Sequence, residues 1–317
     1  MELVCPYLQL PTHGFHFQQK INLRWFENAD ILQTMGERKP SKINLLQDLL
    51  EEGLLAPTSW LEAAGYSRAL LSKYVESGWL NSPARGVYRR PGPQLKWQHV
   101  LASLQLLAGS FLHVGGRTAL VHRGLGQYVR MSGAETILLY GPEVLPAWVN
   151  RLGLQERFVV RNDAMFGALR ARRDPQGALV DFDGEPIAAE RLADLGLQQM
   201  TWGAWDWQLL YSSDERAMFE ALQDVPAKES VYEADVLMQA LGHLRPARVS
   251  ALLRACASVK VKRLFLALAD RHRHSWLAHL DLAGVDMGVG KRMLVPGGKL
   301  HPKYLITLPA DLDDYAR

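Results

Sequence analysis

The chain has 317 residues, of which 48% are hydrophobic and 22% are charged, and its formal net charge at pH 7 is +3. This composition is typical of a globular protein of two or three domains and excludes a mainly disordered or fibrous chain. The two cysteines, Cys5 and Cys256, are far apart in sequence, which excludes a disulfide framework and a zinc site built on paired cysteines.

Residues 1–36 show no sustained helical or strand period. A second methionine, Met35, stands directly before the first region that has one. Two interpretations remain open: these residues are a poorly ordered extension, or they precede a biological start at Met35. They also lack the basic and then apolar layout of a signal peptide.

Residues 37–94 have the pattern of three short helices followed by a hairpin. Ser59 and Glu62 are spaced as a capping box for the second helix, and Ser67 is a candidate cap for the third. A turn at Arg85 and Gly86 leads into a predicted strand over 87–90. This order is typical of a winged helix-turn-helix. Apolar residues predicted to lie in its core are Leu45, Leu46, Leu49, Leu50, Leu70, Leu71, Tyr74, Val75 and Trp79.

Residues 95–211 have a mixed α/β pattern. We expect a helix over 95–107, strands over 111–114, 137–140 and 158–160, and a loop or hairpin over 176–187.

The longest uncharged stretch, residues 97–116, is interrupted by histidines, amides and hydroxyls and ends in two glycines. It therefore predicts an amphipathic helix that leads into a buried strand, not a membrane span. We expect no membrane contact and a cytoplasmic location.

Residues 212–317 are predicted to be mainly helical and basic. Ser212 and Glu215 again have capping-box spacing, and helices are expected over 230–242, 247–255 and 258–272. A short extended segment follows at 300–308. The predicted fold class is therefore α+β, with a winged helix-turn-helix, a mixed α/β region and a helical, basic C-terminal region.

The positive charge is concentrated near the C-terminus. Residues 243–304 hold 12 Lys and Arg against 3 Asp and Glu, a net charge of +9, whereas residues 37–94 have a net charge of only +2. Such a concentration attracts polyanions through counterion release. The alternative is a solvated surface that acidic residues elsewhere partly neutralise.

These patterns identify candidate DNA-binding residues. The first residues of the third helix contact base edges in a winged helix, and cations in the hairpin contact phosphate. In the C-terminal region the lysines and arginines of two segments are candidate phosphate contacts. The candidates are Arg68, Ser72, Lys73, Arg85, Arg89, Arg90, Lys260, Lys262, Arg263, Lys291, Arg292, Lys299 and Lys303.

No pattern predicts catalysis, a cofactor or a metal site. The segment 288–292 resembles a phosphate-binding loop, but Val285 and Arg292 stand where a Walker A loop needs Gly and Ser or Thr. His272, His274 and His279 are interleaved with arginines, which disfavours a divalent metal, so we expect them to be solvated or to face phosphate. We therefore expect a protein that is not an enzyme.

Several segments, in order along the chain, together resemble one family. They are the winged-helix segment with Leu71-Ser72-Lys73-Tyr74-Val75-Glu76-Ser77-Gly78-Trp79-Leu80, then residues 113–120, 212–217, 258–266, 288–292 and 297–304. This series is similar to that of AbiEi-type antitoxins and covers about 40–309. Asp214 stands where the family more commonly has proline.

The resemblance implies an antitoxin of a type IV toxin–antitoxin pair, with residues 37–94 as the DNA-binding domain and 95–317 as the antitoxin domain. It further implies autorepression through inverted repeats in the operator. Its functional partner would be a nucleotidyltransferase-like toxin that it counteracts without a tight complex. The alternatives are a stand-alone winged-helix regulator, an RNA- or protein-interaction module, and an enzyme with an unrecognised site.

Overall fold

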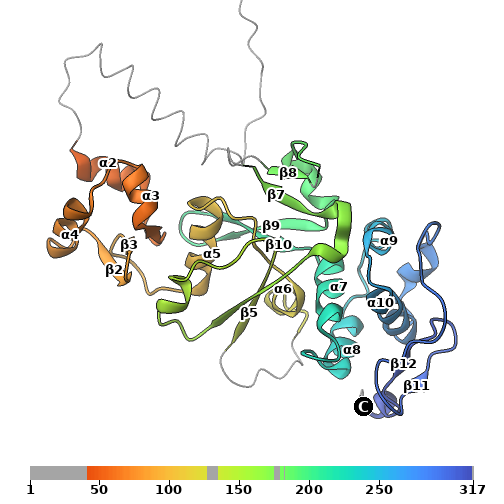
Figure 1. Ribbon diagram of the computed structural model, residues 1–317. Helices are drawn as coiled ribbons and strands as arrows, with labels where there is room; N and C mark the ends of the chain where they lie inside the picture. The colour runs from red at the N-terminus through yellow and green to blue at the C-terminus, as the bar shows by residue number, and fades with distance from the viewer. Residues whose placement is uncertain (1–40, 127–134, 175–178, 182, 316–317) are drawn as a thin grey trace, which may run out of the picture. The chain divides into compact units, whose positions relative to one another are not determined.

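The computed structural model describes residues 41–126, 135–174, 179–181 and 183–315. The interpretations of residues 1–36 thus lie outside the described part of the chain. The chain divides into two compact units, Met1–Leu49 and Leu50–Arg317. The described part of the first unit contains helix α2 (Lys42–Leu49), in which Leu46 is buried and Leu45, predicted to be in the core, is exposed (Figure 1).

The second unit begins with a helix pair and a small sheet. The helices are α3 (Thr58–Ala63) and α4 (Arg68–Glu76), and the strands are β1 (Ala56–Pro57), β2 (Asn81–Ala84) and β3 (Val87–Arg89). The strands are antiparallel in the order β1-β3-β2. This order of elements is consistent with the predicted winged helix-turn-helix, in which β2 and β3 form the wing.

Local chemistry explains where these helices begin. The Ser67 hydroxyl accepts a hydrogen bond from the Leu70 amide at 3.4 Å, which confirms the predicted cap of α4. The predicted cap at Ser59 is wrong, because α3 already begins at Thr58 after Pro57. Instead, the Thr58 amide and hydroxyl both donate to the Gly86 carbonyl, at 2.9 and 3.0 Å, and so join the start of α3 to the wing turn.

The core of this segment differs from the prediction at two aromatic residues. Leu71 is fully buried, but Tyr74 is only half-buried and the Trp79 side chain is 48% exposed. The reason lies at Gly78, whose φ of +77° ends α4 and redirects the chain. Leu80 then occupies the buried position that the sequence pattern had assigned to Trp79.

A five-stranded sheet forms the centre of the second unit, with strand order β6-β5-β4-β10-β9. Pairs β5–β6 and β4–β10 are parallel, and the other two pairs are antiparallel. Its strands are β4 (His113–Val114), β5 (Thr136–Tyr140), β6 (Arg157–Arg161), β9 (Leu197–Trp202) and β10 (Trp207–Ser212), and its helices are α5 (Trp97–Leu106) and α6 (Gly116–His122).

Shorter elements lie between the strands of this sheet. Strands β7 (Ala171–Arg173) and β8 (Leu179–Asp181) pair antiparallel, so the acidic segment after residue 176 contributes one strand of a hairpin. The remaining elements are the 3-10 helices η1 (Val149–Arg151), η2 (Ala164–Leu169) and η3 (Ala189–Ala193).

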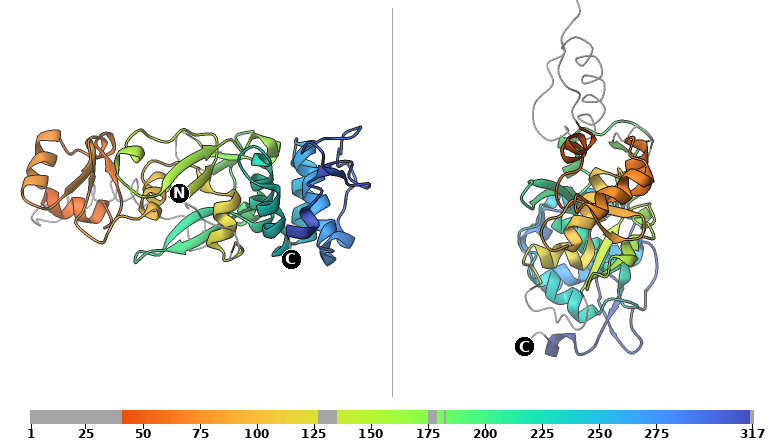
Figure 2. Two further views of the ribbon diagram at one scale, coloured as in Figure 1. Left: turned by 90° about the horizontal axis from the view of Figure 1, so that it is seen from below. Right: turned by 90° about the vertical axis from the view of Figure 1, so that its left-hand side faces the viewer.

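Four helices follow the sheet, close to the predicted ranges. They are α7 (Asp214–Asp224), α8 (Val231–Gln239), α9 (Pro246–Ala255) and α10 (Val259–Arg271). Ser213, not Ser212, caps α7, because Ser212 still belongs to β10. Helix α7 packs against α6 on the sheet and also against α8, α9 and α10 (Figures 1 and 2).

Beyond α10, where no further helix is predicted, the chain is mostly irregular. The chain forms mostly turns, with η4 (Ser275–His279), the two-residue strands β11 (Lys299–Leu300) and β12 (Thr307–Leu308), and α11 (Leu312–Tyr315). The α+β class and the order of its regions are nevertheless confirmed. In the part of the chain that the structure covers, no helix has the length and apolar character needed to cross a membrane.

Candidate nucleic-acid interface

The candidate base-contacting residues lie on the exposed face of α4. Arg68, Ser72 and Lys73 are all exposed, and Arg68 is the first residue of the helix. Helix α4 is the second helix of the helix-turn-helix pair, the one whose N-terminal residues enter the major groove in this motif. The structure therefore places these three predicted residues together on one accessible surface.

Arg68 already has an acidic partner within the protein. Its Nε lies 2.7 Å from Oε1 of Glu62, the penultimate residue of α3. This hydrogen bond and the charge of Glu62 raise the pKa of Arg68. Because both side chains are well exposed, solvent screens the pair and a nucleic acid can compete for the guanidinium.

The wing presents one exposed cation. Arg85 lies in the turn between β2 and β3, next to Gly86, whose φ of +77° suits the tight turn. The bonds from Thr58 to the Gly86 carbonyl hold this turn against α3. Arg85 thus remains a candidate phosphate contact.

The other two wing arginines point inward, contrary to the prediction. Arg89 is buried, and its guanidinium donates to the carbonyls of Arg90 and Pro93, at 3.2 and 2.7 Å. Burial lowers the pKa of Arg89, with Glu52 opposing the shift. Arg90 is half-buried and donates to the Leu50 carbonyl at 3.4 Å. Both side chains therefore stabilise the chain leaving the wing, and the expected DNA contacts from them are corrected.

The cations of α10 are also engaged within the fold. Lys262 and Arg263 are each only 3% exposed. Lys260 is half-buried, and its ammonium donates to the carbonyls of Gln223 and Val225, each at 2.6 Å, where α7 ends. Burial lowers the pKa of Lys260. The prediction that these three residues contact phosphate is therefore corrected.

Arg263 instead organises the loop that precedes β11. Its guanidinium donates to four backbone carbonyls, at 2.6 to 3.1 Å. The acceptors are Met287, Gly288, Gly290 and Leu305. A planar guanidinium with five N–H donors suits such a cluster, which an ammonium could not satisfy in the same way.

The remaining basic candidates lie in this loop, in β11 and in the turn after β11. Lys291, Arg292, Lys299 and Lys303 are exposed, and the Lys303 ammonium lies 3.6 Å from the Asp270 carboxylate. A phosphate-binding loop binds phosphate through its backbone amides. Here the Gly288 amide donates to Asp286 Oδ1 at 2.7 Å instead. The exposed side chains therefore remain the candidate phosphate contacts of this region.

Of the three histidines considered for a metal or for phosphate, His272 and His274 face protein groups, whereas His279 is exposed as expected. His272 Nε2 lies 2.8 Å from Asp235 Oδ1, and His274 Nε2 lies 2.7 Å from the Met238 carbonyl. Both rings are partly buried, which corrects the expected role of these two residues. Among the residues that the structure describes, no group of three metal-binding side chains occurs.

A buried network centres on Glu220, which sequence reasoning missed. Its carboxylate accepts from the Gly116 amide at 2.9 Å, the Ser212 hydroxyl at 2.7 Å and Arg216 Nε at 2.9 Å, and lies 3.3 Å from His113 Nε2. Burial alone would raise the pKa of Glu220, but His113, Arg216 and Ser212 outweigh it, so the pKa lies below its ordinary value.

Arg216 extends this network to another part of the chain. Its Nη2 lies 3.2 Å from Asp163 Oδ2, and its Nη1 donates to the carbonyls of Leu169 and Leu195. Arg216, Asp163 and Glu220 are fully buried, so these charges are paired inside the core. The network joins β4, α6, β10 and α7.

Two family models match the sequence. One describes the N-terminal domain of AbiEi antitoxin transcriptional regulators and matches residues 39–131. The other describes the transcriptional regulator, AbiEi antitoxin, of type IV toxin–antitoxin systems and matches residues 184–309. Together they cover more than half of the chain. The chain belongs to the AbiEi antitoxin family.

One of the solved structures that match this AbiEi chain is a mycobacterial protein. It is the crystal structure of the RV2827C protein from Mycobacterium tuberculosis, which is 17% identical, with a TM-score of 0.48 over 83% of this chain and 89% of that one. No curated protein matches the sequence.

Several of the segments that resemble AbiEi proteins form hydrogen bonds inside the fold. Residues 113–120 and 212–217 supply most of the network around Glu220. At Gly115 an added Cβ would collide with the Glu220 carboxylate, which explains the first of the two glycines. Residues 258–266 and 288–292 meet through Arg263. In this chain, these four segments therefore contribute mainly contacts between polar groups inside the fold.

Proposed function

We propose that this AbiEi-family regulator represses its own operon by binding inverted repeats in the operator. The observation that carries this proposal is the exposed surface formed by Arg68, Ser72 and Lys73 at the start of the second helix of the helix-turn-helix. Arg85 in the wing supplies an adjacent cation. Residues 37–94 form the DNA-binding domain in this proposal.

Residues 95–317 form the antitoxin domain in the same proposal and counteract a nucleotidyltransferase-like toxin without a tight complex. The exposed cations Lys291, Arg292, Lys299 and Lys303 are its candidate contacts with nucleic acid. A toxin gene beside this one is expected. A locus without such a gene would favour the stand-alone regulator.

Arg68→Ala is expected to weaken operator binding about 5- to 150-fold, because a bidentate contact to a guanine is lost. Binding to a scrambled duplex at the same salt concentration should change little. Arg254→Ala, which removes a partly exposed cation elsewhere in the chain, serves as the control. Equal losses on both duplexes would make Arg68 a phosphate contact, and an unchanged operator affinity would remove it from the interface.

The Lys291→Ala, Arg292→Ala double variant is expected to reduce the slope of log affinity against log salt by about 1.8, if both residues contact phosphate. Base preference should stay as in the parent, since phosphate contacts carry no sequence information. Rescue of cells that express the toxin is measured on the same variant. Lost rescue with an unchanged slope would assign this loop to the toxin or its substrate, and two unchanged readouts would contradict any role in binding.

A further inference from the structure

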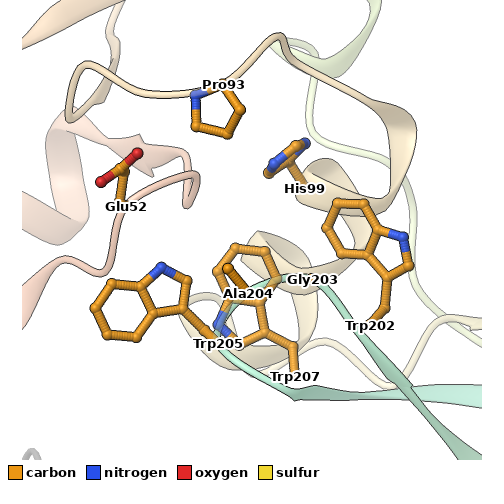
Figure 3. Close-up of a pocket in the computed structure, with 8 residues that line it drawn as sticks. All are labelled: Glu52, Pro93, His99, Trp202, Gly203, Ala204, Trp205 and Trp207. Carbon is orange, nitrogen blue, oxygen red and sulfur yellow. The ribbon is translucent and has the colours of Figure 1, made fainter.

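A pocket of about 260 Å³ lies at the tip of the β9–β10 hairpin (Figure 3). Its walls come from the loop before β1, the segment after β3, the start of α5 and the hairpin itself. None of the DNA-contacting candidates lies in it. The lining residues are Glu52, Pro93, His99, Trp202, Gly203, Ala204, Trp205 and Trp207.

The aromatic walls are fixed by their own contacts. The His99 ring stands edge-on to Trp202, with centroids 4.8 Å apart, and Trp202 lies 5.8 Å from Trp207. The Trp207 indole Nε1 donates to Glu51 Oε2 at 2.7 Å. Gly53 packs beneath these rings, where an added Cβ would lie 2.8 Å from His99 Cδ2. The indoles of Trp202 and Trp207 and the imidazole of His99 are therefore held in place before any ligand arrives, whereas Trp205 is the exposed member of the lining.

The charge of the lining is negative. Glu52 contributes a carboxylate to the lining, and this carboxylate accepts no hydrogen bond from any residue that the structure describes. Arg89 is close enough to interact electrostatically with Glu52, but its guanidinium donates hydrogen bonds to the carbonyls of Arg90 and Pro93. Burial lowers the pKa of His99, so its ring is neutral at physiological pH and does not repel a cation.

We propose that this pocket binds an organic cation, an alkylammonium or guanidinium group. The indole faces attract such a group through their quadrupoles, and Glu52 supplies the opposite charge. A pocket formed by several indoles with one carboxylate at its edge suits a weakly hydrated cation better than an anion or a metal ion. This site is independent of the proposed operator binding.

The test is a calorimetric titration of the full chain with choline and, as its neutral isostere, 3,3-dimethyl-1-butanol. Choline should bind in a saturable manner and the isostere more weakly, by about 2- to 30-fold, the range of a cation–π contribution. Arginine methyl ester should bind as well. Equal binding of choline and the isostere, or no saturable binding of either cation, would overturn the proposal.

Matched tryptophan variants link binding to the pocket. The side chains of Trp205, in the pocket, and Trp79, outside it, are similarly exposed at 49% and 48%. Trp205→Ala and Glu52→Gln should each weaken choline binding about 2- to 30-fold, whereas Trp79→Ala should leave it unchanged. The melting temperature of each variant is measured alongside. If Trp205→Ala folds and still binds choline as the parent does, the site lies elsewhere.

Two further titrations identify the source of the cation and test whether the pocket binds a stacked nucleobase instead. A short arginine peptide amide that binds more tightly than arginine methyl ester would assign the group to a partner protein's side chain. Equal affinities would assign it to a free small molecule, and either result supports the cation site. Tighter binding of adenosine or thymidine than of both cations would show a nucleobase site and overturn the proposal.

Discussion

Arg216→Met is expected to lower the free energy of unfolding by about 3–5 kcal/mol. Arg216 is fully buried between the carboxylates of Glu220 and Asp163, which lie 2.9 and 3.2 Å away. Methionine fills a similar volume but removes the cation that Glu220 and Asp163 share, which leaves Asp163 with Arg170 alone and Glu220 without an arginine. Removing one partner of a buried ionic network costs far more than the intact network contributes over an apolar core. Chemical denaturation measures the difference.

The control for Arg216→Met is an exposed ion pair. Arg254 lies 3.1 Å from Asp281, with both side chains largely solvated, so Arg254→Ala should change the free energy of unfolding by less than about 1 kcal/mol. The double variant Arg216→Met, Glu220→Leu should recover part of the loss, because one uncompensated acid is gone. A loss below about 1 kcal/mol for Arg216→Met would show that the network is not coupled to folding.

Arg263→Met is expected to lower the free energy of unfolding by at least about 2 kcal/mol. The side chain donates to three carbonyls of the loop before β11 and to the Leu305 carbonyl between β11 and β12, and without it these acceptors lose this donor. The effect should be measured without DNA, by denaturation, since it is a property of the folded chain alone.

Arg263→Lys distinguishes this structural role from a phosphate contact. Lysine keeps the charge but cannot direct donors to four carbonyls at once. We expect it to be destabilised nearly as much as Arg263→Met. Normal stability of Arg263→Lys, together with lost DNA affinity in Arg263→Met, would reinstate Arg263 as a DNA-binding residue.

Acid should weaken the fold through Glu220. Its pKa in the folded protein lies below the ordinary value, so the folded state binds fewer protons than the unfolded state near that pH. The resulting stabilisation is complete above the unfolded pKa of about 4.3 and is lost as the pH falls through the folded pKa. Stability measured against pH should therefore fall less steeply in this acid range for Glu220→Gln than for the parent. Parallel curves would contradict this role.

The sequence predicts local structure well where a single side chain decides it. Ser67 caps α4 as predicted, and Val261, Leu264 and Phe265, which have helical spacing within the helix predicted over 258–272, are buried. In each case the deciding contact lies within one helical turn or along one helix face. The winged helix follows from the same local signals.

A count of charged residues along the sequence does not predict which of them are exposed when other segments of the chain cover a helix. Lys262 and Arg263 lie off the apolar stripe of α10, which predicts an exposed position. Arg263 is instead buried against the turns after the helix, and Lys262 is buried as well; no periodicity within α10 contains that information. The strands β9 and β10 were missed for a related reason, since their alternation is short and β10 is buried along most of its length.

The bond between the Gly116 amide and Glu220 spans 104 residues of sequence. During synthesis, the start of α6 leaves the ribosome long before its acceptor does, so the polar centre of the sheet cannot close until α7 has been made. Translation that stops before residue 220 would thus release a chain that carries the complete winged-helix segment 37–94. The region around the five-stranded sheet would lack the Glu220 carboxylate in its core. Such a fragment would be expected to be a substrate for proteases, because its apolar core residues would remain exposed.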